Sequence, residues 1–361
     1  MRVMSIFGTR PEMIKMWATL KKLDELNFEH IMVHTGQNFT PELREFFFKD
    51  LCLRKPDYEL NIDTSCYSKE VADVILKSDE LMAKIKPDAL LVLGDTFSGL
   101  SVLPAAQRNI KIFHMEAGLR AWDRRMPEQR NRILIDHISS ILLPYNHYHR
   151  ENLIREGIHP SKIIVTGNTT FEAMRAFLPQ IEKSEILTTL ELEPKKYILV
   201  TAHRSENVDN PQYLKIIFEA LRKISERYPN FDIIFPMHPR TKSKLADIDI
   251  ANRIRIMNPL GFYDFNKLLK ESFCVLSDSG TAAEEGLFYK VPNVSLRMAT
   301  ERMETLESGS TIVSGMSADN IVESIVTTSS QPWSANYDFC EGFSPSSVVV
   351  NAIRTQITNF F

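Results

Sequence analysis

Short apolar runs alternate with amphipathic stretches along the first half of the chain. The apolar runs predict strands at 2–7, 29–34, 89–93, 111–115 and 162–166, and the amphipathic stretches predict helices at 11–26, 41–51, 67–85 and 127–143. Three of these helical segments, 11–26, 41–51 and 127–143, begin with proline, which is typical of a first helical turn. This half of the chain therefore predicts an α/β domain.

A second series of the same kind starts after residue 168. It predicts strands at 197–201, 233–235, 253–257, 273–277 and 293–296, and helices at 211–228, from about 263, 281–288, 318–327 and 345–358. Strands that alternate with helices imply parallel sheets with right-handed crossovers. The sequence thus predicts two doubly wound α/β domains facing each other across a cleft. The weakly patterned stretch 178–196 is suited to a linker.

Composition and charge narrow the class of protein. A length of 361 residues suits about two domains of roughly 150 residues. The chain has 43 Lys and Arg against 46 Asp and Glu, a net charge of −3 that argues against a general nucleic-acid binder. Its four cysteines form no CxxC pair, so we expect neither a zinc site nor a disulfide framework, and reduced thiols suit the cytoplasm. No apolar run approaches the ~18 residues of a membrane span.

Basic side chains surround the first strand-to-helix turn, at the edge where open α/β sheets bind ligands. Gly8 permits a tight turn, and Arg10 and Lys15 flank a helix N-terminus that itself favours anions. A phosphate or substrate contact is one interpretation; a capped helix with solvated basic residues is the other. The chain contains neither GxGxxG nor GxxxxGK[ST], which disfavours a dinucleotide cofactor and a P-loop.

Three acids follow the next predicted strands or open the next helix. Asp95 and Glu116 come directly after strands, and Glu128 shares a helix face with Arg132. Carboxylates brought together at one sheet edge acquire separated pKa values and can divide acid and base roles. The alternative is that Asp95 and Glu128 cap helices and that Glu116 is an exposed loop acid.

The second half offers a histidine and an anion nest. His203 follows the strand 197–201, where it could transfer a proton or hold a phosphate, or could simply be a hydrogen-bonded loop residue; His238 is a second candidate. The segment 277–281 closes a strand and opens a helix, so its N–H groups and hydroxyls suit an anion, although an ordinary N-cap has the same pattern. Glu285 lies one turn into that helix, and Arg302 could meet the same phosphates.

These segments resemble a known family. The motifs, in family order, are FGTRPEMIK at 7–15, GDT at 94–96, HMEAGLR at 114–120, PEQRNR at 127–132, TGN at 166–168, TAHRSEN at 201–207, DSGTAAEE at 278–285 and ATER at 299–302. Together they resemble the non-hydrolysing UDP-N-acetylglucosamine 2-epimerases over nearly the whole chain. The resemblance implies two Rossmann-like domains in the GT-B arrangement: 1–167, with a C-terminal helix 345–361 packed back on it, and a UDP-binding domain at 168–344.

The resemblance also implies roles for individual residues. Catalytic roles fall to Asp95, Glu116, Glu128, His203 and Lys15, and substrate contacts fall to Arg10, Lys15, Phe265, Ser279, Gly280, Thr281, Glu285 and Arg302. Phe265 would meet uracil, and Glu285 would clamp the ribose. Two departures stand out: Thr281 replaces the usual second glycine of the nest, and Asn38 stands where well-known members have a histidine that binds a regulatory second substrate molecule.

The implied activity is C2 epimerisation of a UDP-N-acetylhexosamine by elimination and re-addition of UDP. It needs no cofactor or metal, and a homodimer is the family expectation. Loop sequences around 34–38, 125–128, 201–209 and 261–262 look more like the branch that makes UDP-N-acetyl-L-fucosamine for surface polysaccharides. The alternatives are a hydrolysing epimerase that releases free ManNAc, a GT-B glycosyltransferase and a non-catalytic UDP-sugar sensor.

Overall fold

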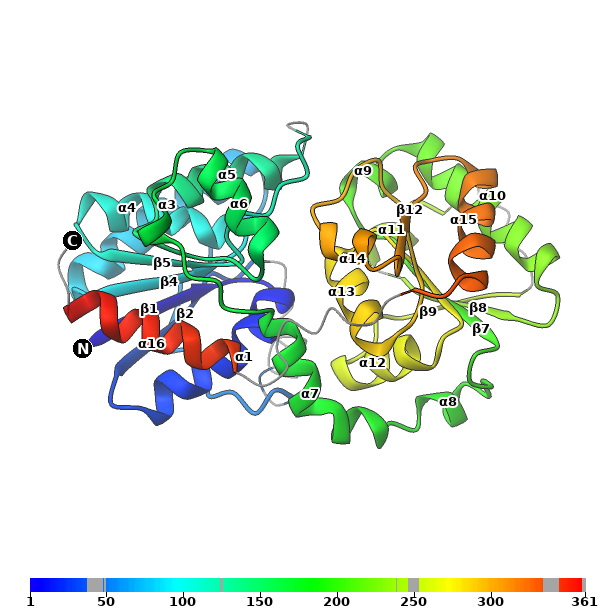
Figure 1. Cartoon of the computed structure of the whole chain (residues 1–361), viewed down its shortest axis with the longest axis horizontal. Coiled ribbons are helices and arrows are strands. Elements are labelled where there is room, and N and C mark those ends of the chain that lie inside the picture. The colour runs from blue at the N-terminus through cyan, green and yellow to red at the C-terminus, as the bar shows by residue number, and fades with distance from the viewer. Residues whose placement is uncertain are drawn as a thin grey trace. The chain divides into compact units, whose positions relative to one another are not determined.

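In the computed structural model the chain forms two compact units (Figure 1). The structure describes residues 1–37, 48, 50–123, 126–237, 239–245, 253–333 and 344–358. Unit 1 comprises residues 1–173 with the described part of 339–361, and unit 2 comprises residues 174–338. Most of the predicted helix 41–51 lies outside the described residues, and so do Asn38 and His238.

Unit 1 is a six-stranded parallel sheet in the order β3-β2-β1-β4-β5-β6. Its strands are β1 (Arg2–Phe7), β2 (Glu29–His34), β3 (Tyr58–Glu59), β4 (Ala89–Leu93), β5 (Lys111–Met115) and β6 (Ile141–Leu143). Its helices are α1 (Arg10–Glu25), α3 (Tyr67–Ile85), η1 (Phe97–Ser101), α4 (Val102–Gln107), α5 (Pro127–Ile138), α6 (His147–Arg155), η2 (Pro160–Lys162) and α16 (Pro345–Thr358). α7 (Thr169–Glu182) leads from unit 1 into unit 2.

Alternate strand residues of unit 1 serve two helical layers. Met4 and Ile6 of β1, with Leu90 and Val92 of β4, pack against α3, α4 and α5. On the other face, α1 and α16 lie side by side, although more than 300 residues separate them in sequence (Figure 1). Because the central strand β4 is buried on both faces, it is a continuous apolar run, whereas the edge strand β3 is polar and partly exposed.

Unit 2 repeats this architecture with the strand order β12-β11-β10-β7-β8-β9. Its strands are β7 (Tyr197–Thr201), β8 (Asp232–Pro236), β9 (Ile254–Met257), β10 (Cys274–Ser277), β11 (Asn293–Ser295) and β12 (Thr311–Val313). Its helices are α8 (Ile186–Thr189), α9 (Ser205–Val208), α10 (Pro211–Arg227), α11 (Pro239–Lys242), α12 (Phe262–Glu271), α13 (Gly280–Tyr289), α14 (Met303–Glu307) and α15 (Ala318–Ser330).

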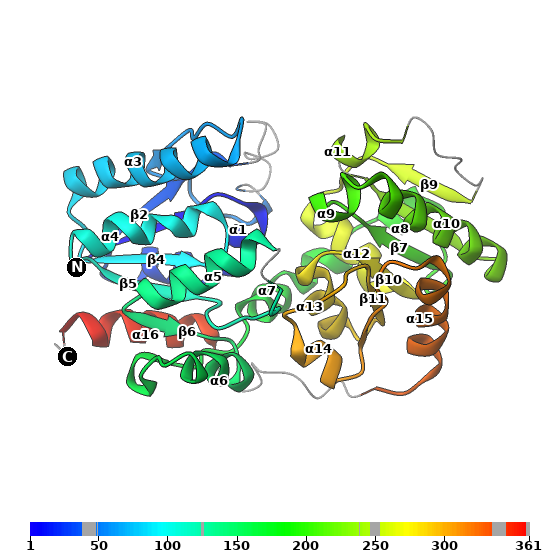
Figure 2. The ribbon, with the colours of Figure 1, turned by 90° about the horizontal axis from the view of Figure 1, so that it is seen from above.

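The core of unit 2 divides between the two faces of its sheet. Ile198 and Val200 of β7 pack with α10 and α15, whereas Tyr197 and Leu199 pack with α8, α12 and α13. Figure 2 shows the two helical layers on either side of these strands. β7 and β10 are neighbouring parallel strands, so the connections that follow them lie at the same carboxyl edge, which is where ligands of such sheets bind.

Three predicted elements differ from the structure. The predicted helix 127–143 ends at Ile138, because Ser139 and Ser140 interrupt the helical pattern and residues 141–143 join the sheet as β6. Residues 162–166 form only one isolated bridge, between Ile163 and Leu142. The supposed linker 178–196 contains the end of α7 and all of α8.

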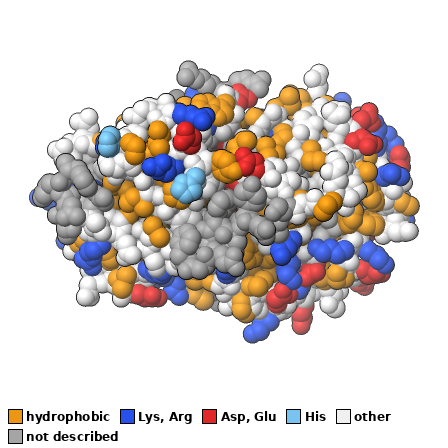
Figure 3. Space-filling model, viewed as in Figure 1, with side chains coloured by type: hydrophobic (Ala, Val, Ile, Leu, Met, Phe, Trp, Pro, Cys, Tyr) orange, Lys and Arg blue, Asp and Glu red, His pale blue; other side chains and the backbone are white. Residues whose placement is uncertain are grey.

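The surface carries mixed charge. On the face drawn in Figure 3, described Lys and Arg side chains are interspersed with Asp and Glu. Among the described residues, no helix combines the length and apolar character needed to span a bilayer.

One carboxylate fixes the start of α16. Glu172 of α7 accepts hydrogen bonds from the Ser346 N–H and hydroxyl, both at 2.8 Å, and also from the Ser344 hydroxyl. Lys22 of α1 donates to Ser344 at 2.7 Å, so three segments meet at this point. A negative charge beside a helix N-terminus also complements the helix dipole.

We predict that Glu172→Ala lowers the free energy of unfolding by about 1–3 kcal/mol, because buried donors lose a charged acceptor. Urea unfolding followed by circular dichroism measures the loss. Glu151→Ala, which removes an exposed pair with Arg155, is the matched control and should cost under about 0.5 kcal/mol. Equal losses in the two variants would contradict the role given to Glu172.

Candidate active site

The carboxyl edge of the unit 1 sheet gathers the first group of predicted residues. Lys15 lies in the second turn of α1, and Glu116 follows β5. The Lys15 Nζ and Glu116 Oε2 atoms are 2.5 Å apart, and both side chains are at least 95% buried. The hydroxyl of Tyr145, after β6, donates to the same Oε2 at 2.9 Å. Glu116 is therefore not an exposed loop acid, and two donors orient its carboxylate.

Asp95 is held on the same edge by α5. Arg132 of α5 forms an ion pair with the Asp95 carboxylate, and the Asn131 side chain donates to the Asp95 carbonyl oxygen at 2.9 Å. Asp95 does not cap the following turn, because Thr96 occupies the cap position of η1. Glu128 lies half-buried in the first turn of α5.

A residue that sequence reasoning missed joins the two loops. One oxygen of Glu12 accepts from the N–H groups of Gly8 and Thr9 and from the Thr9 hydroxyl, at 2.7–3.1 Å. Its other oxygen accepts from Thr96 at 2.8 Å and from Ser98. Burial raises the pKa of Glu12, although these hydrogen bonds oppose the shift. The capping pattern Thr9-x-x-Glu12 was visible in the sequence as a possible signal; the bridge to Thr96 was not.

Unit 2 holds the second group at its own carboxyl edge. Asp278, directly after β10, is fully buried and accepts from the backbone N–H groups of His203 and Arg204 at 3.0 Å and from the Asn207 side chain at 3.1 Å. The His203 ring lies 3.4 Å from Asp278 Oδ1, with half of its side chain exposed. Asp278 thus fixes the loop that presents His203.

The predicted nest lies at the N-terminus of α13. Ser279 occupies the N-cap and accepts from the Ala282 N–H at 3.5 Å, so the capping interpretation is correct. A Cβ on Gly280 would lie 3.0 Å from Glu301 Oε1 and 3.2 Å from Arg302 Nε, so a side chain here would require both of these buried side chains to shift. Ser279, Gly280 and Thr281 are half-buried, so the N–H groups of this turn face a partly open surface.

Buried charges surround the base of the nest. Arg302 Nη1 lies 3.5 Å from Glu284 Oε1, and Arg297 pairs with Glu301 at 2.9 Å. Glu285 is buried in α13, and Phe265 of α12 packs against the core that contains Leu268 and Val275. In unit 1, Arg10 is the half-buried first residue of α1. Among the described residues, no three His, Cys, Asp or Glu side chains form a group able to hold a metal.

Glu304, at the start of α14, should make the stability of the protein depend on pH. Burial raises its pKa to about 7; Glu284 and Glu301 add to the rise, and Arg302 opposes it. A carboxyl whose pKa is raised by folding stabilises the folded state below its unfolded pKa and loses that contribution as the pH rises through about 7.

We therefore expect the thermal midpoint to fall between pH 5 and pH 8, and Glu304→Gln to reduce this fall by on the order of 5 °C. Differential scanning calorimetry at both pH values measures it. Glu307→Gln, an exposed position on the same helix, should leave the pH dependence unchanged. A fall of equal size in wild type and Glu304→Gln would contradict the prediction.

Comparisons with known proteins agree with this architecture. A UDP-N-acetylglucosamine 2-epimerase from Methanococcus maripaludis is 37% identical, with 96% of this chain and 97% of that protein covered. A Pseudomonas aeruginosa UDP-2,3-diacetamido-2,3-dideoxy-D-glucuronate 2-epimerase is 33% identical, with 91% and 92% covered. The crystal structure of the Methanocaldococcus jannaschii UDP-GlcNAc 2-epimerase with UDP-GlcNAc and UDP superposes with a TM-score of 0.91 at 36% identity, covering 98% of this chain and 99% of that one.

These matches confirm the predicted fold class, two Rossmann-like units of the GT-B type. The family model for UDP-N-acetylglucosamine 2-epimerase matches residues 21–347. On this evidence the chain belongs to the UDP-N-acetylglucosamine 2-epimerase family.

Proposed function

We propose that this protein interconverts UDP-N-acetylglucosamine and UDP-N-acetylmannosamine by eliminating UDP and adding it back, without hydrolysis. Family membership supports the reaction class. The observation that carries the proposal is the buried Glu116 carboxylate, held by Lys15 and Tyr145 on the same sheet edge as Asp95. Carboxylates on rigid supports at a sheet's carboxyl edge suit proton transfer at a sugar carbon.

The reaction moves one proton and one leaving group. A base removes the C2 proton, that electron pair forms the C1=C2 bond, and the C1–O bond to UDP breaks, which leaves a 2-acetamidoglucal. UDP then bonds to C1 again while an acid protonates C2 on the opposite face. The sugar is neither oxidised nor reduced overall, so the proposed route requires no hydride carrier. It does require acid and base groups, and cations for the departing diphosphate.

Unit 1 supplies the groups we assign to the sugar. Asp95, Glu116 and Glu128 are assigned to proton transfer, and Arg10 and Lys15 to the phosphates and the anionic transition state. Lys15 and Tyr145 both contact Oε2 of Glu116, and a Cβ built on Gly94, the neighbour of Asp95, would lie 3.9 Å from Oε1. Preorganised charge of this kind is a large contribution to catalysis of charge-separating steps.

Unit 2 supplies the groups we assign to UDP. The N–H groups at Gly280 and Thr281, the Ser279 hydroxyl and the Arg302 guanidinium are assigned to the diphosphate, while the Ser279 N–H donates to the Ser277 hydroxyl at 2.9 Å. Glu285, one turn further along α13, would accept hydrogen bonds from the ribose hydroxyls, and Phe265 would contact uracil. His203, on its Asp278-anchored loop, is assigned to the departing phosphate or to proton transfer.

Assaying the chain with UDP-GlcNAc also distinguishes three other activities. A hydrolysing epimerase would release free ManNAc, a glycosyltransferase would require an acceptor, and a sensor would bind without turnover. The C2 epimerisation that yields UDP-N-acetyl-L-fucosamine, the cytoplasmic location and the homodimer stay predictions. The family also contains a protein named for a diacetamido-glucuronate substrate, so the sugar must be tested directly.

Turnover of UDP-GlcNAc in D2O should place one deuterium at C2 of UDP-ManNAc, because the C2 proton is lost to a solvent-exchangeable group. NMR and mass spectrometry of the product measure it. The 6-deoxy-L-talo substrate, assayed in parallel, tests the alternative sugar. Product that keeps its original C2 hydrogen would exclude elimination, and free ManNAc would identify a hydrolase.

The two units should respond differently to substitution. Glu116→Gln should lower kcat by roughly 10²-fold or more, the usual scale for a general acid or base, with UDP affinity nearly unchanged. Glu285→Ala should weaken UDP binding by about 1–3 kcal/mol, because the ribose hydroxyls lose a charged acceptor. Steady-state kinetics and calorimetry with UDP separate the effects. Near-native kcat in Glu116→Gln, or unchanged UDP affinity in Glu285→Ala, would remove that residue from the site.

A further inference from the structure

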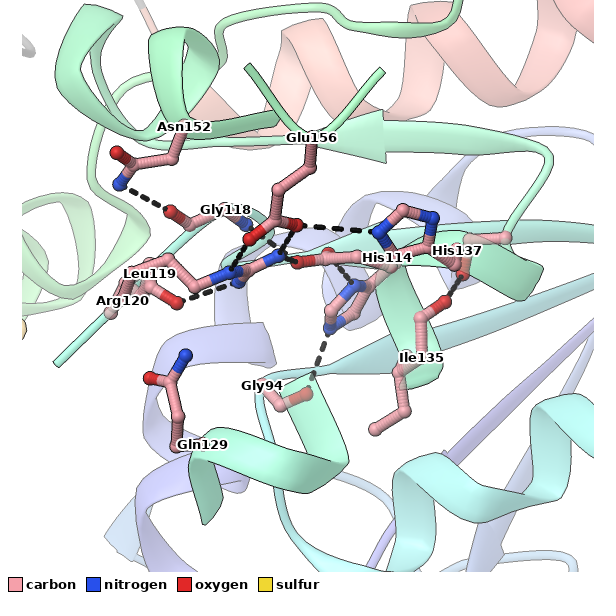
Figure 4. Close-up of polar contacts among 12 residues, drawn as sticks. Gly94, His114, Gly118, Leu119, Arg120, Gln129, Ile135, His137, Asn152 and Glu156 are labelled. Atoms are coloured by element: carbon pink, nitrogen blue, oxygen red, sulfur yellow. Dashed lines mark hydrogen bonds and ion pairs between the residues drawn. The ribbon is translucent and has the colours of Figure 1, made fainter. Parts of the chain in front are cut away.

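A buried network of charged residues underlies the unit 1 site. Figure 4 shows His114, Gly118, Arg120 and Glu156 converging beside α5. Asp136 of α5 is fully buried; it accepts from His114 Nδ1 at 2.8 Å and from the Gly118 N–H at 3.1 Å, and forms an ion pair with Arg120 at 2.8 Å. Burial by itself would raise the pKa of Asp136, but His114 and Arg120 hold it below its usual range. The Asp136 carboxylate is therefore anionic with three donors around it.

His114 extends the network to the neighbouring strand. Its Nε2 lies 2.8 Å from the Gly94 carbonyl oxygen, which can only accept a hydrogen bond. Its Nδ1 faces the Asp136 carboxylate, which is also an acceptor. Both ring nitrogens therefore donate, and the ring bridges the end of β4 to α5. Gly94 directly precedes Asp95.

The Glu116 loop has a conformation that needs support. Glu116 itself has φ = +63°, and Gly118 has φ = +80°. A Cβ on Gly118 would lie 2.3 Å from the His149 carbonyl oxygen, so the loop is pressed against α6. A left-handed conformation is strained for a non-glycine residue and persists only where its surroundings enforce it. The Asp136–Gly118 hydrogen bond lies two residues from the strained position.

We propose that His114 and Asp136 form a positioning pair that holds the two proposed catalytic carboxylates in place. Asp136 fixes the position of Glu116 through the Gly118 N–H. His114 fixes the position of Asp95 through the Gly94 carbonyl. This inference rests on the proposed function, because Asp95 and Glu116 have their roles there. The pair touches no substrate. Its effect is to hold two carboxylates in a fixed relation at the edge of one sheet, where a displacement of 1 Å can cost about 10²-fold in rate.

Two nearly isosteric variants test the two arms of the pair separately: the contact from Asp136 to Gly118 and the contact from His114 to Gly94. Asp136→Asn replaces one acceptor oxygen by an NH2 group, so at least one of the three donors around it must lose its acceptor. His114→Asn can keep the donor to Asp136, at the position of Nδ1, but cannot reach the Gly94 carbonyl. Glu156→Gln is the matched control, because Glu156 pairs with Arg120 at 2.6 Å and contacts neither Gly94 nor Gly118 in the described network.

The test is a pair of double-variant cycles on kcat, measured with UDP-GlcNAc as substrate. Asp136→Asn should lower kcat by about 10²-fold in the wild-type background but by less than about 3-fold when Glu116 is already Gln. His114→Asn should likewise lower kcat by about 10²-fold in the wild-type background, but by less than about 3-fold when Asp95 is already Asn. UDP affinity by calorimetry should change less than about 2-fold in every variant, and Glu156→Gln should keep kcat within about 3-fold.

A merely structural role gives a different pattern. If Asp136→Asn lowers kcat by the same factor with and without the Glu116 carboxylate, the proposal is overturned for that arm, and equal factors for His114→Asn overturn the other. If Asp136→Asn does not fold, the His114 cycle decides the proposal alone. Turnover by the wild-type chain and its loss in Glu116→Gln test the proposed function separately, so the two ideas can fail independently.

Discussion

Burying charge at the end of a parallel sheet is the constraint on which the unit 1 site depends. Lys15, Glu116, Arg120, Arg132 and Asp136 are all at most 4% exposed. A buried ion without a partner costs several kcal/mol, so each of these groups requires an opposite charge or a hydrogen bond at a fixed place. The loops after β1, β4 and β5 consequently have little freedom, because shifting any one of them would break a pair that belongs to another.

In unit 2, one buried carboxylate holds the loop that presents His203. Asp278 receives two backbone N–H groups and one side-chain amide, and so ties the loop after β7 to the end of β10. Backbone donors carry no formal charge, so this support leaves the His203 ring free to face solvent over half of its surface. The loop after β7 in unit 2 is thus held by hydrogen bonds to the Asp278 carboxylate, whereas Glu116 and Asp95 in unit 1 are held by ion pairs with Lys15 and Arg132. Unit 2 also contains buried ion pairs, Arg297–Glu301 and Arg302–Glu284, below the turn at the start of α13.

Much of this could be predicted from the sequence, and the exceptions have physical reasons. The strands β2, β4 and β5 and the helices α3 and α16 lie where their apolar patterns predict. The predicted helix 127–143 wrongly includes the residues of β6, because three apolar residues are too few to show a strand period. With that strand missed, Tyr145 was not recognised as a residue at a strand end. Glu12 and Asp136 were missed because their partners lie up to 86 residues away, and spacing along the chain does not report such contacts.

One face of α5 holds both of the loops that carry Asp95 and Glu116. Glu128, Arg132 and Asp136 are spaced four residues apart, so they follow one another along the helix surface. Arg132 holds Asp95 and Asp136 holds the Glu116 loop, both from fully buried positions, whereas Glu128 at the helix start is only half-buried. Asp95, Arg10 and the 279–281 turn are also only half-buried. Several groups assigned to the substrate are thus partly exposed to water, whereas the side chains that hold them are buried. Binding would then replace water at these groups by substrate without reorganising the side chains beneath them, which is the condition under which fixed charges act most strongly on a transition state.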